Sequence, residues 1–245
     1  MVKRLFDVAL AALALVAAAP LLAVAAVAIR LASPGPIVYR AERTGRGRRP
    51  FVMYKLRTMH ARRRGDGSRI TGKNDPRVFP LGSWLRRAKL DELPQLINVL
   101  KGDMAIVGPR PEDPRIVALH YAPVHLETLM MRPGLASPGS IYSYTHGEAL
   151  LVGADPEALY VKRLLPLKVA LDVVYVRRAS LGYDARIIGR TIWVILAMLA
   201  GRRRFRNPPE LAAAQRLLDG PAPVGLPAPH ASAPAPTAAP PTPVS

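Results

Sequence analysis

The 245-residue chain contains no cysteine. This absence excludes disulfide bonds, thiolate nucleophiles and cysteine-based zinc sites, and it is compatible with a reducing compartment. Aromatic residues are also scarce, at 6% of the chain. Proteins that bind single-stranded nucleic acid usually interleave aromatic and basic side chains, and that pattern is weak here, so the sequence predicts no nucleic-acid partner.

Two common phosphate-binding signatures are missing, the Walker lysine loop and the Rossmann glycine pattern. The stretch RTGRGRRP, residues 43–50, resembles neither closely, so any nucleotide site is of another type. What the chain has in excess is positive charge: 35 Lys and Arg against 17 Asp and Glu give a formal net charge of +18. Such a charge is typical of proteins that meet the phosphates of nucleic acid, anionic lipid or a phosphorylated substrate.

The N-terminal segment is an uncharged run from Val8 to Ile29. As one helix it would be about 33 Å long, which is enough to cross a bilayer. A secretory signal peptide is an alternative because the start is basic. However, the apolar run is long for a signal peptide, and AIRLASPGP is a poor cleavage site.

Pro20 lies in the middle of this run, where a proline kinks or breaks a helix. Basic residues flank the run on both sides: Lys3 and Arg4 before it, and Arg30, Arg40 and Arg43 after it. The positive-inside rule therefore places both ends in the cytoplasm. A helix–break–helix hairpin over residues 1–36, which enters one leaflet and returns, satisfies this rule. The simpler alternative is one transmembrane anchor with a tolerated proline.

Residues 37–205 are interpreted as one catalytic α/β domain, mostly helical with a small sheet. The pattern of residues 37–59, short apolar runs divided by a basic Gly-rich turn, predicts a β-hairpin or short strands. Residues 60–78 are predicted to be a polar surface loop. Leu93, Leu96, Ile97 and Leu100 have the spacing of one helix face, and Gly102 is placed to end that helix.

Further helices are expected after this segment. They lie at residues 112–131 on either side of Pro123, at 154–180 with a break near Pro166, and at 183–205. The apolar run of the helix at 183–205 is too short to span a bilayer. Because its end is basic, this helix could lie on an anionic membrane surface. Residues 132–150 are predicted to be a loop. Residues 206–245 form a Pro/Ala-rich tail, expected to be disordered from about residue 220.

The motif LDELPQL, residues 90–96, places Asp91 and Glu92 side by side. Pro94 is compatible with a helix that begins here, because proline is tolerated in the first turn. The helix dipole favours ionised carboxylates at that end. Taken alone, the pair is most simply a capping acid and a first-turn glutamate.

The surrounding basic residues favour a second interpretation. Arg86, Arg87 and Lys89 precede the pair, while Arg110 in GPRP and Arg132 in MRPG are held by neighbouring prolines. Arginine in a fixed geometry binds phosphate oxygens bidentately. The carboxylates could therefore hold Mg²⁺ while the arginines bind a diphosphate. An ionised carboxylate can also attack phosphorus and form an acyl phosphate.

Five segments occur in an order that resembles a known family: KRLFD ahead of the apolar run, YKLRTM, LDELPQLINVLKGDMAIVGPRP, MRPG and LDVVYV. They cover roughly residues 3–200. The chain is similar to the bacterial sugar transferase family, the monotopic polyprenyl-phosphate phosphoglycosyl transferases that start exopolysaccharide, O-antigen and glycoprotein glycan assembly.

This resemblance implies a reaction and a location. A sugar-1-phosphate would move from a UDP-sugar to undecaprenyl phosphate with release of UMP, in a ping-pong mechanism that needs Mg²⁺ and forms a covalent aspartyl phospho-sugar. The N-terminal helix would be re-entrant in the lipid of the bacterial inner membrane, and the active site would face the cytoplasm.

The resemblance also implies roles for single residues. Asp91 matches the nucleophile, which contacts Mg²⁺, and Glu92 matches its partner. Pro20 matches the proline that breaks the hairpin. The positions that match basic residues, interpreted as binding the substrate phosphates, are Arg86, Arg110, Arg132, Lys55 and Arg57.

The segment after MRPG departs from the family pattern. Many members continue with Thr-Gly, an aromatic or apolar residue, and Ala-Gln-Val. Here the Gln is missing, and Tyr142, Tyr144 and His146 stand nearby. A polar loop with packing tyrosines is the simplest interpretation. The departure does not affect the residues that match the catalytic pair. However, the sequence does not determine which sugar is transferred or which polysaccharide pathway the protein serves.

Other functions stay open at this point. A membrane-anchored basic binding or scaffold protein without activity would explain the charge but not the carboxylate pair. An isoprenyl-diphosphate or nucleotidyl enzyme is a weaker option. A homodimer is compatible with the sequence. Asp172 in LDVVYV has either a helix-packing or a direct role, and Asp7 is expected to pair with an arginine at the membrane edge.

Overall fold

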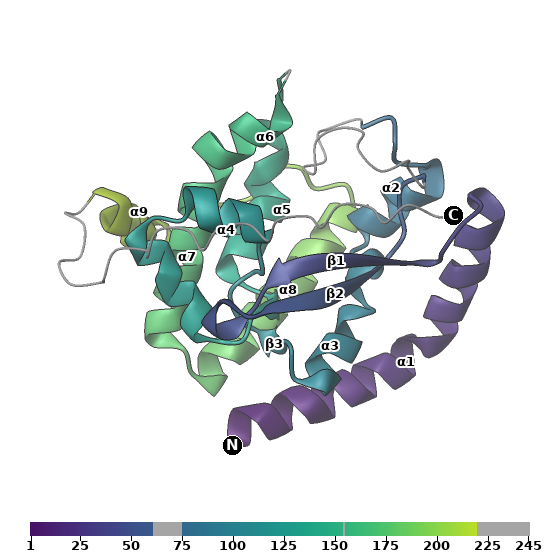
Figure 1. Cartoon of the computed structure of the whole chain (residues 1–245), viewed down its shortest axis with the longest axis horizontal. Coiled ribbons are helices and arrows are strands. Elements are labelled where there is room, and N and C mark those ends of the chain that lie inside the picture. Colours follow the sequence, from purple (N-terminus) through teal and green to yellow (C-terminus); the bar gives the residue numbers. More distant parts are fainter. Residues whose placement is uncertain (61–74, 154, 220–245) are drawn as a thin grey trace, which may run out of the picture.

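The computed structural model describes residues 1–60, 75–153 and 155–219. Most of these residues are helical (Figure 1). In chain order the elements are α1 (Val2–Ala32), β1 (Val38–Thr44), η1 (Arg46–Arg48), β2 (Pro50–Leu56), α2 (Pro80–Arg87), η2 (Leu90–Glu92), α3 (Gln95–Lys101), β3 (Ala105–Val107), α4 (Pro114–His120), η3 (Pro123–Met130), β4 (Gly134–Ala136), α5 (Pro138–Leu150), α6 (Pro156–Leu159), η4 (Tyr160–Leu164), α7 (Leu165–Arg178), α8 (Leu181–Leu199) and α9 (Leu211–Asp219).

Helix α1 is a single element that contains Pro20. The two separate arms expected from the sequence are therefore one continuous helix. In place of a break the helix bends, as its course along the lower right of Figure 1 shows. An interior proline removes one backbone hydrogen bond and kinks the helix, and here the rest of the hydrogen-bond ladder holds it together.

Much of α1 is exposed and apolar. By length and composition it is the one helix of the described ranges that could cross a membrane. The residues that the domain buries are Asp7, Ala11, Ala25 and Ile29. Its large apolar residues that are at least 61% exposed are Val2, Leu5, Leu13, Val16, Val24, Val27 and Leu31. In a water-soluble protein such a face would be covered.

The KRLFD segment docks the start of α1 on the domain. Lys3 Nζ donates to Asp184 Oδ2 of α8 at 2.5 Å and to a β3 carbonyl at 3.1 Å. Arg4 donates to two of the last carbonyls of α3, at 2.6 and 3.0 Å. Asp7 Oδ1 accepts the backbone N–H of Ile106 at 3.1 Å and pairs with Lys3 at 3.9 Å. The expected arginine partner of Asp7 is therefore wrong.

The strands form two small sheets. β1 and β2 pair antiparallel from Val38 opposite Leu56 to Thr44 opposite Pro50, which confirms the predicted hairpin. β3 and β4 pair parallel, so residues 105–107 lie beside residues 134–136. The main core includes Leu96 and Val99 of α3, β3, Tyr175 of α7 and Ile187 of α8.

The predicted loop at 132–150 is wrong, because it contains β4 and the 13-residue helix α5. Ser137 caps α5: its Oγ accepts the Ser140 N–H at 2.9 Å, and Pro138 occupies the first turn. These turn-forming residues therefore begin a helix. In α3 the predicted face is also partly wrong. Ile97 is 41% exposed, and Val99 is buried in its place.

The C-terminal elements follow the prediction more closely. The predicted break near Pro166 is a change of helix type: the π-helical segment η4 joins α6 to α7 without a non-helical residue between them, and Pro166 lies in the first turn of α7. Within the range assigned to the tail, α9 packs on α7 and buries Ala214. The expected disorder from about residue 220 lies outside the described residues, as does most of the predicted polar loop.

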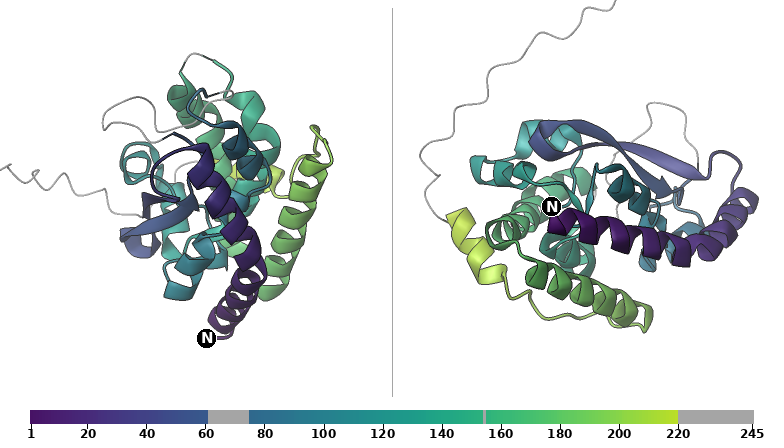
Figure 2. Two further views of the ribbon diagram at one scale, coloured as in Figure 1. Left: turned by 90° about the vertical axis from the view of Figure 1, so that its right-hand side faces the viewer. Right: turned by 90° about the horizontal axis from the view of Figure 1, so that it is seen from below.

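Helices α1 and α8 lie toward the same side of the molecule, as the view from below shows (Figure 2). Helix α8 is amphipathic. It buries Asp184, Ile187 and Val194. Its exposed apolar residues are Leu181, Ile192, Trp193, Leu196 and Leu199. One side of the molecule therefore presents two helices with exposed apolar faces.

Candidate active site

The carboxylate pair lies on the turn η2, between α2 and α3. Lys89, just before it, has a left-handed backbone conformation with φ of 57°. Such a conformation is uncommon for a residue with a side chain, and it reverses the chain sharply after α2. Asp91 and Glu92 are then turned inward and are only 6% and 7% exposed. The prediction that the pair sits just before a helix is confirmed.

Glu92 is saturated with hydrogen bonds. Its Oε1 accepts from Lys55 Nζ at 3.1 Å and from Arg110 Nη2. Its Oε2 accepts from Arg110 Nη1 at 2.9 Å and from the Tyr144 hydroxyl at 3.1 Å. Burial alone would raise its pKa, but the charges of Arg110 and Lys55 hold that pKa well below its usual range. Glu92 is thus a fixed anion that anchors its neighbours.

Asp91 has the opposite environment. Its Oδ1 is buried and has no hydrogen-bond partner among the described residues. Burial, with the charge of Glu92 added, raises the pKa of Asp91 despite nearby cations such as Lys55 and Lys89. A buried polar atom without a partner is costly and rare. In a site this rich in cations, it is the group free to meet a ligand.

Arg110 is fixed by its backbone as well as by its side chain. Its N–H donates to Asp172 Oδ2 at 2.9 Å, while Asp172 Oδ1 accepts the Gly139 N–H at 2.8 Å. Buried Asp172 thus ties the GPRP turn to the first turn of α5. Burial raises the pKa of Asp172 to about 6. A Cβ added at Gly139 would overlap the Lys168 carbonyl and lie 2.8 Å from Asp172, so this close approach requires glycine.

The other predicted basic residues divide into two groups. Lys55 and Arg86 belong to the site. Arg86 Nε donates to Thr58 Oγ1 at 2.8 Å; burial lowers its pKa, and the charge of Asp91 opposes that shift.

Arg57 and Arg132 lie elsewhere. Buried Arg57 donates to the carbonyls of Pro34 and Ser33 at 2.6 and 2.5 Å, so it holds the end of α1. Arg132 Nε donates to the Gly102 carbonyl at 2.9 Å, at the opposite end of α3 from the carboxylates. Neither arginine therefore lies in the expected phosphate cluster. Arg132 precedes Pro133, but a neighbouring proline restrains the backbone without directing the side chain.

Two residues of the site were not assigned to it from the sequence. Tyr144 of α5 donates to Glu92 and accepts from Arg110 Nη1 at 3.2 Å. Lys89 places its Nζ 3.6 Å from the centre of the Tyr144 ring. Burial lowers the pKa of Lys89 to about 8. A signal for Tyr144 was present in the sequence, since Ser-Pro-Gly-Ser at 137–140 is a helix N-terminus that carries Tyr144 inward.

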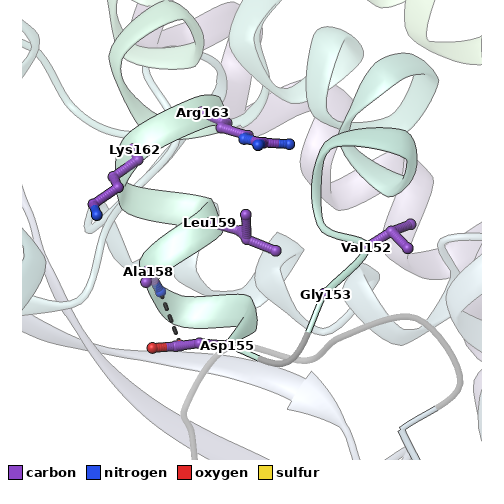
Figure 3. Close-up of a pocket in the computed structure, with 7 residues that line it drawn as sticks. All are labelled: Val152, Gly153, Asp155, Ala158, Leu159, Lys162 and Arg163. Carbon is purple, nitrogen blue, oxygen red and sulfur yellow. Dashed lines mark hydrogen bonds between the residues drawn. The ribbon is translucent and has the colours of Figure 1, made fainter.

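Two cavities lie away from this cluster. One of about 370 Å³ lies beside the α5–α6 connection, where Leu159 and Arg163 point toward Val152 and Asp155 caps α6 (Figure 3). Another of about 350 Å³ lies between α5, α8 and residues 205–209. Neither is lined by Asp91, Glu92 or their hydrogen-bond partners, so the carboxylate site is distinct from both.

The donor set limits how a metal could bind. Within the described ranges no group of three or more His, Cys, Asp or Glu is placed to hold an ion. Both oxygens of Glu92 are occupied, whereas Asp91 Oδ1 is free. Mg²⁺ in phosphoryl-transfer sites often takes one or two carboxylates, substrate phosphates and water. A single free aspartate therefore fits Mg²⁺ better than a metal that needs an all-protein cage.

The fold and the site define a class of protein. A buried reactive carboxylate, a second carboxylate locked as an anion and several fixed cations suit an enzyme that acts on phosphoryl groups. The model of the bacterial sugar transferase family matches residues 1–198, and the chain belongs to this family. This match confirms the resemblance drawn from the motifs. It also confirms the predicted enzyme class, the polyprenyl-phosphate phosphoglycosyl transferases.

Several relatives are similar to the chain. The UDP-glucose:undecaprenyl-phosphate glucose-1-phosphate transferase of Caulobacter vibrioides is 39% identical over 78% of this chain and 68% of its own length. An Aeromonas hydrophila UDP-N-acetylgalactosamine-undecaprenyl-phosphate N-acetylgalactosaminephosphotransferase is 34% identical over 82% of this chain and 45% of its own. The exopolysaccharide production protein PSS of Rhizobium leguminosarum is 35% identical over 78% of this chain and 92% of its own.

Proposed function

We propose that this chain transfers a sugar-1-phosphate from a UDP-sugar to undecaprenyl phosphate and releases UMP. The names of the relatives support the donor and acceptor classes. The observation that carries the mechanism is the unequal state of the two carboxylates. Glu92 is held by four donor contacts, and Asp91 keeps a buried oxygen without a partner.

The reaction proceeds in two displacements on one phosphorus atom. Asp91 forms a bond to the phosphorus that carries the sugar, the bond from that phosphorus to UMP breaks, and UMP leaves with the electron pair. A phosphate oxygen of the polyprenyl acceptor then attacks the same phosphorus and releases Asp91. The products are UMP and a polyprenyl-diphosphate sugar. This ping-pong sequence lets one carboxylate serve both half-reactions.

The fixed cations support these steps. Arg110 and Arg86 lie beside the carboxylates, and their positions suit them to bind the phosphate oxygens of the donor. Asp91 is the residue that would hold Mg²⁺, whose chemistry is to neutralise charge on the phosphate oxygens. The buried Asp91 must be ionised to attack, and Lys55, Lys89 and Arg86 favour that form.

The position of α1 supports a monotopic, re-entrant arrangement. Lys3 and Arg4 bond the start of α1 to α8, β3 and α3. At the other end, Arg57 donates hydrogen bonds to the carbonyls of Ser33 and Pro34, directly after α1. Ile29, near that end of α1, is buried in the domain. A straight span would separate these ends by the thickness of the bilayer, and one domain could not then hold both.

The site lies next to the second half of α1. Leu90 of η2 and Leu85 of α2 pack in one cluster with Ala25 and Ile29. A phosphate at the membrane surface would therefore be close to Asp91. The basic residues that flank α1 favour the cytoplasmic side of the bacterial inner membrane. We place the reaction at the start of exopolysaccharide, O-antigen or related glycan assembly.

The test is UMP release by the protein in nanodiscs with undecaprenyl phosphate, Mg²⁺ and a panel of UDP-sugars. One or more donors should give UMP, and Asp91→Asn should reduce release to background. Asp155→Asn, which alters a carboxylate that only caps α6, is the matched control. A labelled donor sugar should remain attached to the wild-type protein when acceptor is omitted.

The alternative, a membrane-anchored basic binding or scaffold protein, predicts a different result. Folded wild-type protein would then release no UMP with any donor, and Asp91→Asn would behave like wild type in every assay. UMP release without a labelled protein would retain the reaction and reject the covalent step.

A further inference from the structure

Lys89 differs from the other cations of the site in having no hydrogen-bond acceptor. Lys55 and Arg110 bond to Glu92, and Arg86 bonds to Thr58. Within the described residues the Lys89 ammonium makes no hydrogen bond or ion pair; it rests on the Tyr144 ring, 3.6 Å from its centre. A ring face attracts a cation but fills none of its three N–H donors. Those donors are free for a ligand.

Tyr144 brings two cations together. Its ring lies under Lys89, and the Arg110 guanidinium carbon is 6.0 Å from the ring centre. Its hydroxyl bonds both Glu92 and Arg110. Two like charges near one ring repel each other unless anions compensate them. The two carboxylates Asp91 and Glu92 face four cations, Lys55, Arg86, Lys89 and Arg110. The cluster is therefore short of negative charge.

The contacts of Tyr144 argue against two other roles, proton transfer by its hydroxyl and stacking of a base on the ring face toward Lys89. Its hydroxyl donates to one partner and accepts from another, and burial raises its pKa further above its ordinary value, so the hydroxyl keeps its proton and does not act as an acid. The ring face toward Lys89 is covered, so a uracil base cannot stack there. What remains is a platform that sets the distance between two phosphate-binding cations.

We propose that Lys89 is an additional phosphate-binding residue for the diphosphate of the donor, and that Tyr144 is the positioning residue that holds Lys89 and Arg110 around it. This inference rests on the proposed function, since it names how the same site holds its nucleoside-diphosphate substrate. The ligand completes the charge balance of the cluster and fills the free donors of Lys89.

The test measures UDP binding by calorimetry on the protein in nanodiscs with Mg²⁺. Lys89→Met removes the charge but keeps the aliphatic stem on the ring. It should weaken UDP binding by about tenfold or more, the size expected for one charge-assisted hydrogen bond. Lys89→Arg, which restores a cation able to lie on the ring, should recover most of the affinity.

The chain contains a matched control at the other end of α3. Lys101 lies 5.3 Å from the centre of the Tyr54 ring and also pairs with Asp103. Lys101→Met removes the same charge from another lysine–tyrosine pair. It should leave UDP affinity unchanged, which separates a specific contact from the loss of one charge in a basic protein.

Tyr144 variants separate the ring from the hydroxyl. Tyr144→Phe keeps the platform, so UDP affinity should change less than about threefold, while UMP release falls because Arg110 loses a partner. Tyr144→Leu should weaken UDP binding as Lys89→Met does. The double variant Tyr144→Leu/Lys89→Met should bind no worse than Tyr144→Leu alone, because both changes remove one arrangement.

The outcomes distinguish the two proposals. If wild-type protein binds UDP and Lys89→Met binds it equally well, the role of Lys89 is wrong and the proposed reaction stands. If folded wild-type protein binds no UDP, the donor class itself is wrong and both proposals fall. Melting temperatures of all variants in the same nanodiscs identify any variant that fails to fold, and Lys89→Arg then decides the question.

Discussion

Arg110 and Glu92 form a two-point ion pair in the interior of the site. Arg110 Nη1 lies 2.9 Å from Glu92 Oε2, and Arg110 Nη2 donates to Oε1. The planar guanidinium matches the carboxylate, so the pair fixes direction as well as distance. This relationship makes Glu92 the anchor of the cation cluster and leaves Asp91 as the carboxylate with a free oxygen.

Glu92→Gln should therefore damage both stability and activity. The amide keeps the shape but leaves Arg110 and Lys55 buried without their anion. Breaking a buried pair on one side costs about 3–5 kcal/mol. Misplaced cations should lower UMP release by about 100-fold. Urea unfolding in detergent and the UMP assay measure the two effects.

The control for this change is an exposed pair of the same type. Glu127 accepts two hydrogen bonds from Arg177, at 2.8 and 2.6 Å, but the side chains of Arg177 and Glu127 are 45% and 23% exposed. Glu127→Gln should cost at most about 1 kcal/mol and leave activity unchanged. Equal losses in both variants would contradict the assignment of Glu92 as a buried anchor.

Asp172 should give the protein a specific pH dependence of stability. Its pKa is about 6 when folded, against about 3.9 in an unfolded chain. The unfolded state thus loses its proton first as pH rises. The contribution of Asp172 to the free energy of unfolding is present below about pH 4 and lost through about pH 6, by up to about 3 kcal/mol.

Asp172→Asn isolates this contribution, because the amide does not titrate. The stability of wild type relative to Asp172→Asn should be greatest near pH 4 and smaller at pH 7. Lys168, whose charge opposes the rise in the pKa of Asp172, stays in both proteins. A difference that is constant between pH 4 and pH 7 would show that Asp172 does not titrate in this range.

Substitution of Gly139 tests how closely α5 approaches α7. A methyl group there would overlap the Lys168 carbonyl and crowd Asp172. Gly139→Ala should therefore shift the first turn of α5, displace Tyr144 and lower the melting temperature by several degrees. Gly189→Ala on α8 meets open space and should be neutral or stabilising by up to about 1 kcal/mol. Equal melting temperatures for the two variants would contradict this packing.

The parts of the fold that follow from local sequence were predictable. The β1–β2 hairpin and the carboxylates before α3 depend on neighbouring residues, namely the basic Gly-rich turn and Pro94. α5 was missed because Pro138 and Gly139 are typical of turns, and only the Ser137 cap and the contact with α7 make them a helix start.

Side-chain assignments failed where tertiary contacts decide them. Arg57 and Arg110 are both basic residues in conspicuous motifs, yet one binds the carbonyls after α1 and the other binds Glu92. No local pattern separates them. Lys89 was noticed only for its charge, because its contact with Tyr144 joins residues 55 positions apart in sequence.

The proposed re-entrant arrangement predicts that both ends of α1 are reachable from the cytoplasm. The chain has no cysteine, so a single introduced one is labelled without background. Val2 is the first residue of α1 and Tyr39 lies in β1, after its end; they are 68% and 55% exposed. In inside-out membrane vesicles, Val2→Cys and Tyr39→Cys should both react with a membrane-impermeant maleimide, and in intact spheroplasts neither should.

Pro20→Ala extends this test to the bend of α1. Alanine restores the missing backbone hydrogen bond and removes the steric cause of the kink, so α1 should straighten. A straight α1 cannot keep Lys3 on Asp184 while Arg57 holds its other end. Part of the Val2→Cys protein should then label from the opposite side in the Pro20→Ala background, with a matching loss of UMP release. Unchanged labelling and activity would mean that docking of the two ends, and not Pro20, imposes the bend.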